Sequence, residues 1–135
     1  MHYKCTSCKS RFPNVKKPVW LCRCGKPLSV HYSWENTTFD LAIKMDEYSL
    51  WRYASILPNV TNPISLGEGF TPLLPLTSNL FVKNETVNPT GSFKDRGMSL
   101  AITMAKEQGV KNICLPSAGN AGISAAAYCR EAKIN

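Results

Sequence analysis

The feature that most restricts the fold of this chain is the alternation of strand and helix patterns in its C-terminal part. The predicted elements are a buried strand over residues 79–83, a helix over 92–108 closed by Gly109, a strand over 112–115 and an alanine-rich helix over 120–133. A right-handed crossover makes the two strands parallel and brings the loops at 84–91 and 116–119 to one edge of the sheet. The chain is therefore predicted to be an α/β protein.

One amine stands at the start of the first of these helices, in the segment NPTGSFKDRG at residues 88–97. Ser92 is the predicted N-cap and Asp95 its reciprocal partner, which puts Lys94 in the first helical turn. The free N–H groups and the dipole of that turn disfavour a cation and so favour a neutral, nucleophilic amine. The alternative is an ordinary surface lysine, which is what most isolated lysines are.

The second helix is preceded by small residues, in the segment SAGNAG at 117–122. Gly119 and Gly122 bracket the predicted helix start at Asn120, where the missing side chains let backbone N–H groups approach an anion. Residues 117–119 are therefore candidates for holding a carboxylate. The alternative is a routine strand-to-helix loop.

Four cysteines form two short pairs near the N-terminus: Cys5, Cys8, Cys22 and Cys24. Two cysteine-bearing turns on facing hairpins can close a tetrahedral zinc site, and a segment this small has little core to fold around otherwise. The second pair has the spacing Cys-x-Cys, which leaves open whether His2 or His31 replaces a cysteine. Four buried free thiols without metal are the alternative, since the chain has the character of a cytoplasmic protein, in which disulfides are rare.

All of the net charge of +7 lies in residues 1–34. That segment has no acid, whereas residues 35–135 hold nine residues of each sign. Its seven basic residues are Lys4, Lys9, Arg11, Lys16, Lys17, Arg23 and Lys26. Thiolates on zinc would carry negative charge that these residues partly offset. We expect no nucleic-acid partner, because the segment lacks a helix pattern that could enter a groove.

The middle of the chain, residues 35–78, has a helix-like pattern over residues 40–53 with apolar residues at mixed spacings of three and four. Several prolines then indicate an irregular segment that leads into the C-terminal part. The segment LGEGFTPL at 66–73 is by itself an ordinary turn.

Three motifs occur in order along the chain: LGEGFTPL at 66–73, VKNETVNPTGSFKDRG at 82–97 and SAGNAG at 117–122. Together they resemble the fold-type II pyridoxal-phosphate enzymes and, among them, the threonine synthases. The resemblance covers about residues 64–134, and the cysteine-rich front segment is similar to that of many bacterial and archaeal threonine synthases. It implies a parallel three-layer α/β sheet preceded by a small zinc ribbon. We expect the zinc ribbon in residues 1–34, a helical and irregular lead-in in 35–78, and the start of the α/β domain in 79–135.

By this resemblance Lys94 binds pyridoxal 5'-phosphate through an imine, and Asn120 hydrogen-bonds the hydroxyl of the cofactor ring. Ser117, Ala118 and Gly119 hold the carboxylate of a small amino-acid substrate. The implied reaction converts O-phosphohomoserine and water to threonine and phosphate, with Lys94 as general base. The alternatives are a relative such as cysteate synthase or threonine dehydratase, and a zinc-ribbon binding module joined to a non-catalytic remnant.

The family's glycine-rich phosphate loop and the Ser or Thr that faces the cofactor's ring nitrogen come from sequence beyond the asparagine loop, and neither occurs in these 135 residues. We therefore expect the N-terminal piece of a longer enzyme, inactive alone, with a homodimer as one candidate state of the full-length protein. The sequence has no apolar run of membrane-spanning length and no signal-peptide pattern, so we expect a cytoplasmic protein without a membrane partner.

Overall fold

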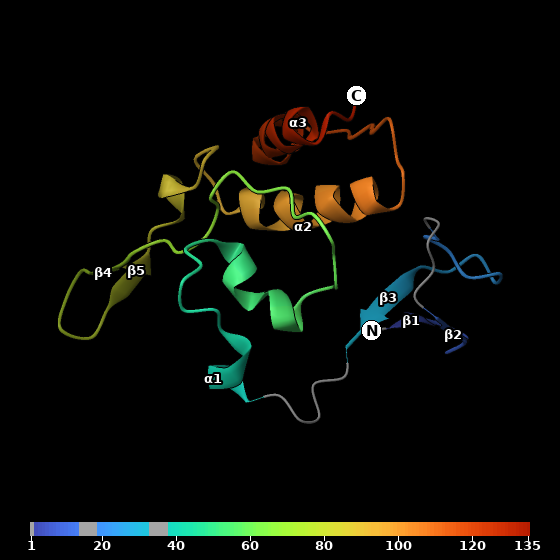
Figure 1. The fold of residues 1–135 in the computed structure, drawn as a ribbon, viewed down its shortest axis with the longest axis horizontal. Coiled ribbons are helices and arrows are strands. Elements are labelled where there is room, and N and C mark those ends of the chain that lie inside the picture. The colour runs from blue at the N-terminus through green and yellow to red at the C-terminus, as the bar shows by residue number, and fades with distance from the viewer. Residues whose placement is uncertain (1, 14–18, 33–37) are drawn as a thin grey trace.

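The computed structural model describes residues 2–13, 19–32 and 38–135, which form an N-terminal sheet, a hairpin and two long helices (Figure 1). The strands are β1 (His2–Cys5), β2 (Arg11–Phe12), β3 (Leu28–His31), β4 (Leu73–Pro75) and β5 (Phe81–Lys83). The helices are α1 (Phe39–Ala42), η1 (Leu50–Ile56), η2 (Glu85–Val87), α2 (Lys94–Glu107) and α3 (Asn120–Ala132), where η marks a 3-10 helix. The predicted boundary between residues 34 and 35 lies outside the described residues.

The N-terminal sheet is antiparallel, with β1 between β2 and β3. Its register sets Cys5 opposite Leu28, and the next backbone N–H, that of Thr6, donates to the Pro27 carbonyl at 3.1 Å. Because β1 ends at Cys5 and β3 begins at Leu28, the turns that carry the two cysteine pairs meet at one end of the sheet.

The helix predicted over residues 40–53 is wrong, because the structure has two short helices there. α1 is only four residues long, and η1 follows after the Ser49 hydroxyl accepts a hydrogen bond from the Trp51 N–H at 3.1 Å. Between them the Lys44 N–H donates to the Arg52 carbonyl at 2.9 Å, so the backbone doubles back. The Ser49 side chain caps a new helix within the segment, so the apolar pattern does not continue as a single helix.

The strand predicted over residues 79–83 forms only as β5, and it pairs antiparallel with β4 in a hairpin that projects away from the long helices (Figure 1). Its side chains are exposed, for example Phe81 at 52% and Val82 at 41%, so the prediction of a buried strand is wrong. All six residues of β4 and β5 are exposed.

Residues 112–115 are extended but form no strand, so the predicted parallel pair with residues 79–83 is also wrong. The backbone of Lys111 and Ile113 pairs instead with Asn135, the last residue of the sequence. Asn135 donates its N–H to the Lys111 carbonyl at 2.9 Å and accepts from the Ile113 N–H at 2.7 Å. Asn135 thus bonds to the residues before and after Asn112, which is the hydrogen-bond pattern of parallel strands. Such a sheet requires several strands with both faces covered, which these few residues do not supply.

The two predicted long helices are confirmed as α2 and α3. α2 ends before Gly109, which has a φ of 75° and donates its N–H to the Lys106 carbonyl at 2.9 Å. α3 ends at Lys133, which adopts the left-handed conformation. Within the described parts of the chain, no helix has both the length and the apolar character that crossing a membrane requires.

The core lies between these two helices, which pack side by side (Figure 1). Its buried members are Ile102, Tyr128, Ala132 and Ile134. Partly buried side chains from the loop before β4, including Ile64, and from the segment after α2, including Ile113, pack against them. The two helix starts are therefore held on one small but continuous core.

Candidate active site and metal centre

Lys94 is the first residue of α2 and is partly exposed. Its backbone N–H donates to the Ser92 hydroxyl at 3.3 Å, so Ser92 supports the helix start, although Phe93 is the residue that directly precedes the helix. The Lys94 amine lies 4.7 Å from the centre of the Phe93 ring. The structure thus places this amine at a helix start, against an aromatic face and partly open to solvent.

Asp95 does not make the reciprocal bond to Ser92 that the sequence predicted. It is fully buried, and its carboxylate accepts hydrogen bonds from the Thr90 N–H at 2.7 Å, the Thr90 hydroxyl at 2.5 Å and the Ser124 hydroxyl at 2.5 Å. Ser124 lies one turn into α3. A single carboxylate therefore ties the start of α2 to the start of α3, and sequence reasoning missed Ser124 because nothing local marks its partner.

This tie brings the ends that carry Lys94 and Asn120 to the same side of the helix pair. Asn120 is the first residue of α3 and is exposed. The Ser117 hydroxyl accepts hydrogen bonds from the N–H groups of Gly119 at 3.3 Å and Gly122 at 3.1 Å. A Cβ on Gly122 would lie 2.8 Å from the Ser117 carbonyl oxygen, so this loop closes tightly onto the helix only because that residue is glycine.

Glu68, in the first of the three motifs, is a fully buried carboxylate that sequence reasoning did not single out. Its Oε2 accepts from the Tyr128 hydroxyl at 2.7 Å and the Leu66 N–H at 2.9 Å, and the Ser65 hydroxyl lies within 3.2 Å of both oxygens. Burial and the bond to Glu68 raise the pKa of Tyr128. The sequence feature that could have indicated this residue is an acid placed between two glycines. A buried carboxylate needs hydrogen-bond donors, and these are supplied here by Tyr128, Leu66 and Ser65.

Glu85 and Arg96 form a second polar centre between the motifs. Arg96 donates from Nε and Nη2 to the two carboxylate oxygens, each at 2.8 Å. The Thr71 hydroxyl at 2.7 Å and the Asn88 amide at 2.9 Å also donate to Glu85. The bonds from Arg96, reinforced by those from Thr71 and Asn88, lower the pKa of Glu85 to about 2 although partial burial opposes the shift. Asn88 in turn accepts from the Gly69 N–H at 2.9 Å, so the first two motifs are bonded to each other.

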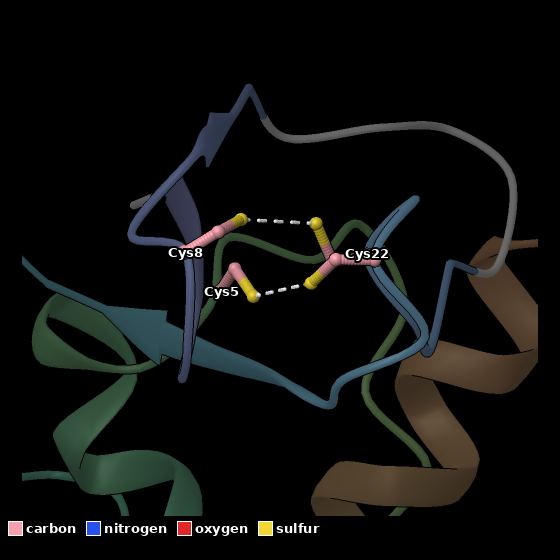
Figure 2. Close-up of side chains that lie close together, drawn as sticks. Cys5, Cys8 and Cys22 are labelled. Carbon is pink, nitrogen blue, oxygen red and sulfur yellow. Dashed lines mark hydrogen bonds between the residues drawn. The ribbon is translucent and has the colours of Figure 1, made fainter.

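The four N-terminal cysteines converge as their spacing predicted (Figure 2). All four sulfurs lie within 4.8 Å of one another. The Cys5 and Cys24 sulfurs are 3.5 Å apart, as are those of Cys8 and Cys22. Tetrahedral zinc with bonds of about 2.3 Å holds thiolates at this kind of separation. Gly25 follows with a φ of 76°, the left-handed turn that suits such a knuckle.

The two histidines stay away from this cluster. His2 and His31 face each other across β1 and β3, with ring centres 5.4 Å apart. The group of potential metal ligands consists of the four cysteines, so the tighter Cys-x-Cys spacing still brings both of its sulfurs to the centre.

The electrostatics of the cysteines also fit a cation. Hydrogen bonds from the Ser10 hydroxyl and N–H lower the pKa of Cys8 to about 6. At Cys22 the backbone N–H of Cys24 acts in the same direction, but burial and the neighbouring sulfurs raise the pKa overall. One thiolate in the group thus opposes ionisation of the next, and a divalent ion at the centre removes that conflict.

The described residues also fit the lysine side of a pyridoxal-phosphate site. The Lys94 amine can bond a carbonyl carbon, the Asn120 amide can donate to a ring hydroxyl, and both belong to adjacent helix starts. The first N–H groups of a helix favour anionic ligands. The chemistry of this donor set therefore agrees with the resemblance of the three motifs.

Comparison with known proteins gives the same class. The pyridoxal-phosphate dependent enzyme family matches residues 64–135. Over 98% of this chain, the threonine synthase of Methanosarcina acetivorans is 34% identical, and over 95% that of Methanocaldococcus jannaschii is 36% identical; 35% of each relative is covered. The threonine synthase of Bacillus sp. (strain ULM1) is 50% identical over 58% of this chain and 25% of its own length.

The chain belongs to the pyridoxal-phosphate dependent enzyme family. Its similarity to threonine synthases extends through the cysteine-rich segment, since the two archaeal alignments include nearly the whole chain. The chain spans about a third of the length of these curated relatives.

Proposed function

We propose that this chain is part of a cytoplasmic threonine synthase that converts O-phosphohomoserine and water to threonine and phosphate. The observation that carries the proposal is the hydrogen bond between Ser124 and Asp95, which joins the starts of the two helices that begin with Lys94 and Asn120. The similarity to threonine synthases over 95–98% of the chain supports this substrate over that of other relatives that use the same cofactor.

Each site residue has a proposed role. Pyridoxal phosphate, when bound, withdraws electrons from the α-carbon of the amino acid attached to it. Lys94 is the covalent attachment point and then the base that removes the proton from that α-carbon. Asn120 orients the ring through its hydroxyl, and Ser117, Ala118 and Gly119 hold the substrate carboxylate. Asp95 acts on the reaction only by fixing the helix start that carries Lys94.

The cysteine cluster is proposed to hold one structural zinc ion through Cys5, Cys8, Cys22 and Cys24. Four thiolate ligands leave no open coordination position, so such an ion stabilises the N-terminal segment without taking part in the reaction. The segments 1–34, 35–78 and 79–135 are retained as a proposed division, with the zinc ribbon as the first. The basic residues of this segment, with no acid among them, offset part of the negative charge of four thiolates, which supports a structural role over nucleic-acid binding.

We further propose that residues 1–135 alone are inactive and that the complete enzyme, which could be a homodimer, supplies the cradle for the cofactor's phosphate. The length of the relatives supports this, because they are almost three times as long as the part that this chain matches. A zinc-ribbon binding module with a non-catalytic remnant is the second candidate. Attachment of the cofactor to Lys94 supports the enzyme, and its absence supports the binding module.

The test is borohydride reduction of the complete protein after incubation with pyridoxal phosphate, followed by peptide mapping. We expect the label on Lys94, and we expect Lys94→Ala to abolish turnover while the protein stays folded. Lys111→Ala, which removes an exposed lysine outside the site, is the matched control and keeps both label and activity. Label on Lys83, Lys106 or Lys111 instead contradicts the assignment of Lys94.

A further inference from the structure

A cavity of about 660 Å³ lies between η1, the loop before β4, β5 and the start of α2. Its lining includes Arg52, Phe70, Thr71, Lys83, Glu85 and Arg96. It belongs to a different side of α2 from the amine at the helix start, because Lys94 and Arg96 are two positions apart and do not share a helical face. None of the roles proposed above uses this cavity.

The charges that line the cavity are unbalanced. Three of its residues are basic and one is acidic. The acid is already engaged, since Arg96 binds both oxygens of Glu85 at 2.8 Å. Within the described residues, neither Arg52 nor Lys83 has a carboxylate at ion-pair distance. Arg52 and Lys83 line the same cavity, so their positive charges repel each other, and a bound anion would attract both.

Arg52 is held in place for such a contact. Its guanidinium carbon lies 4.6 Å from the centre of the Phe70 ring, which fixes the planar group by stacking. Its Nε–H is buried and has no hydrogen-bond partner among the described residues, so this guanidinium has unused donor capacity. Phe70 has a φ of 50°, a conformation that a residue with a side chain seldom adopts, and it places the ring beneath Arg52.

Lys83 approaches from β5 on the same cavity wall. Its amine donates to the Thr71 carbonyl oxygen, which leaves further protons of the ammonium group for a ligand. A planar guanidinium and a compact ammonium together suit a tetrahedral oxyanion, which can accept from both at once. The two unpaired positive charges match the charge of a phosphate dianion.

We propose that this cavity is a second anion site, which binds inorganic phosphate or the phosphate group of a small monoester through Arg52 and Lys83. Phe70 holds the Arg52 guanidinium flat, and the Glu85–Arg96 pair keeps the wall of the cavity rigid. The site is independent of the Lys94 chemistry, so a failure of one proposal leaves the other standing.

The experiment is a titration of the protein with inorganic phosphate, followed by calorimetry and by phosphorus NMR, with chloride at matched ionic strength as the reference. We expect saturable binding, and we expect Arg52→Gln and Lys83→Gln each to weaken it by about tenfold or more, because each removes a charge-assisted hydrogen bond. Lys94→Ala should bind phosphate as the unchanged protein does. A monoester such as glycerol phosphate, compared with phosphate itself, distinguishes the two sources of the anion.

The matched controls are Arg130→Gln and Lys111→Gln, which remove the same charges from exposed positions outside the cavity. If all four variants weaken phosphate binding equally, or if binding does not saturate, the anion is attracted only by the net charge of +7 and the site is refuted. Circular dichroism verifies that each variant is folded. If Arg52→Gln is not, Lys83→Gln decides the question, because its side chain extends from the exposed strand β5.

Discussion

Replacement of Asp95 by asparagine is the sharpest test of how the two helix starts are held together. The buried carboxylate accepts three hydrogen bonds, two on Oδ1 and one on Oδ2. In Asp95→Asn the amide oxygen must face the Thr90 N–H, which can only donate, so the amide nitrogen faces the hydroxyls of Thr90 and Ser124. Both hydroxyls can turn to accept, but all three bonds lose the contribution of a charged partner. At about 1 kcal/mol for each bond, the free energy of unfolding should fall by about 3 kcal/mol.

Urea unfolding monitored by circular dichroism measures this loss, with Asp46→Asn as the control because Asp46 is exposed. Ser124→Ala, which removes only the bond between the helices, should fall between the two. A loss for Asp95→Asn of less than about 1 kcal/mol, or one equal to that of the control, would refute the reasoning, since it would mean that these bonds add little in a buried site.

The remaining predictions concern a close contact, a pH effect and the metal. Gly69→Ala should destabilise the fold by about 2 kcal/mol or more in the same urea assay, because φ is 96° and the new Cβ would lie 2.8 Å from the Leu50 nitrogen; an unchanged midpoint contradicts this. Below pH 4.5 the protein should lose stability as the pH falls toward 2, because the pKa of Glu85 is lowered from 4.5 to about 2 and its protonation breaks the bonds from Arg96. This acid-sensitive contribution, about 1 kcal/mol after solvent screening, should disappear in Glu85→Gln, and an identical pH profile for that variant argues against it. The purified protein should hold one zinc ion by elemental analysis and lose it in Cys24→Ser, whereas a metal-free protein with freely reactive thiols contradicts the zinc site.

The parts of the fold that could be predicted from the sequence are those fixed by nearby residues. The alanine-rich segment before Lys133 and the segment before Gly109 form helices because their periodicity and end residues act locally. The cysteines converge because two short turns need only one strand pairing between them to meet.

The strands were predicted less well, because a strand exists only through its partner. Residues 79–83 have a suitable composition for a buried strand, yet the partner available in this chain is the preceding apolar segment, and the result is an exposed hairpin. Among the described residues, 112–115 have no neighbouring strand of sufficient length, and Asn135 is the residue that pairs beside them. The parallel sheet implied by the family resemblance is a property of more strands than the described residues contain.

The supporting polar residues of the site were hidden for a different reason. Glu68 and Tyr128 are 60 positions apart in the sequence, and no local pattern indicates that one hydroxyl will reach one carboxylate. Lys94 could be singled out because its setting is a short motif. The contacts that hold that motif in place depend on tertiary packing, which composition and spacing do not encode.

The bonds around Glu68 have a consequence for motion. Its carboxylate is joined to α3 through Tyr128, its carbonyl accepts from the Leu50 N–H at 2.7 Å, and the next residue, Gly69, donates to Asn88. A turn fastened at three points to three separate segments cannot open on its own. The amide protons of Leu66 and Gly69, although they belong to a loop, should therefore exchange with solvent only when these contacts to the neighbouring segments break, so this loop fluctuates with the core and any movement that admits a substrate must occur elsewhere.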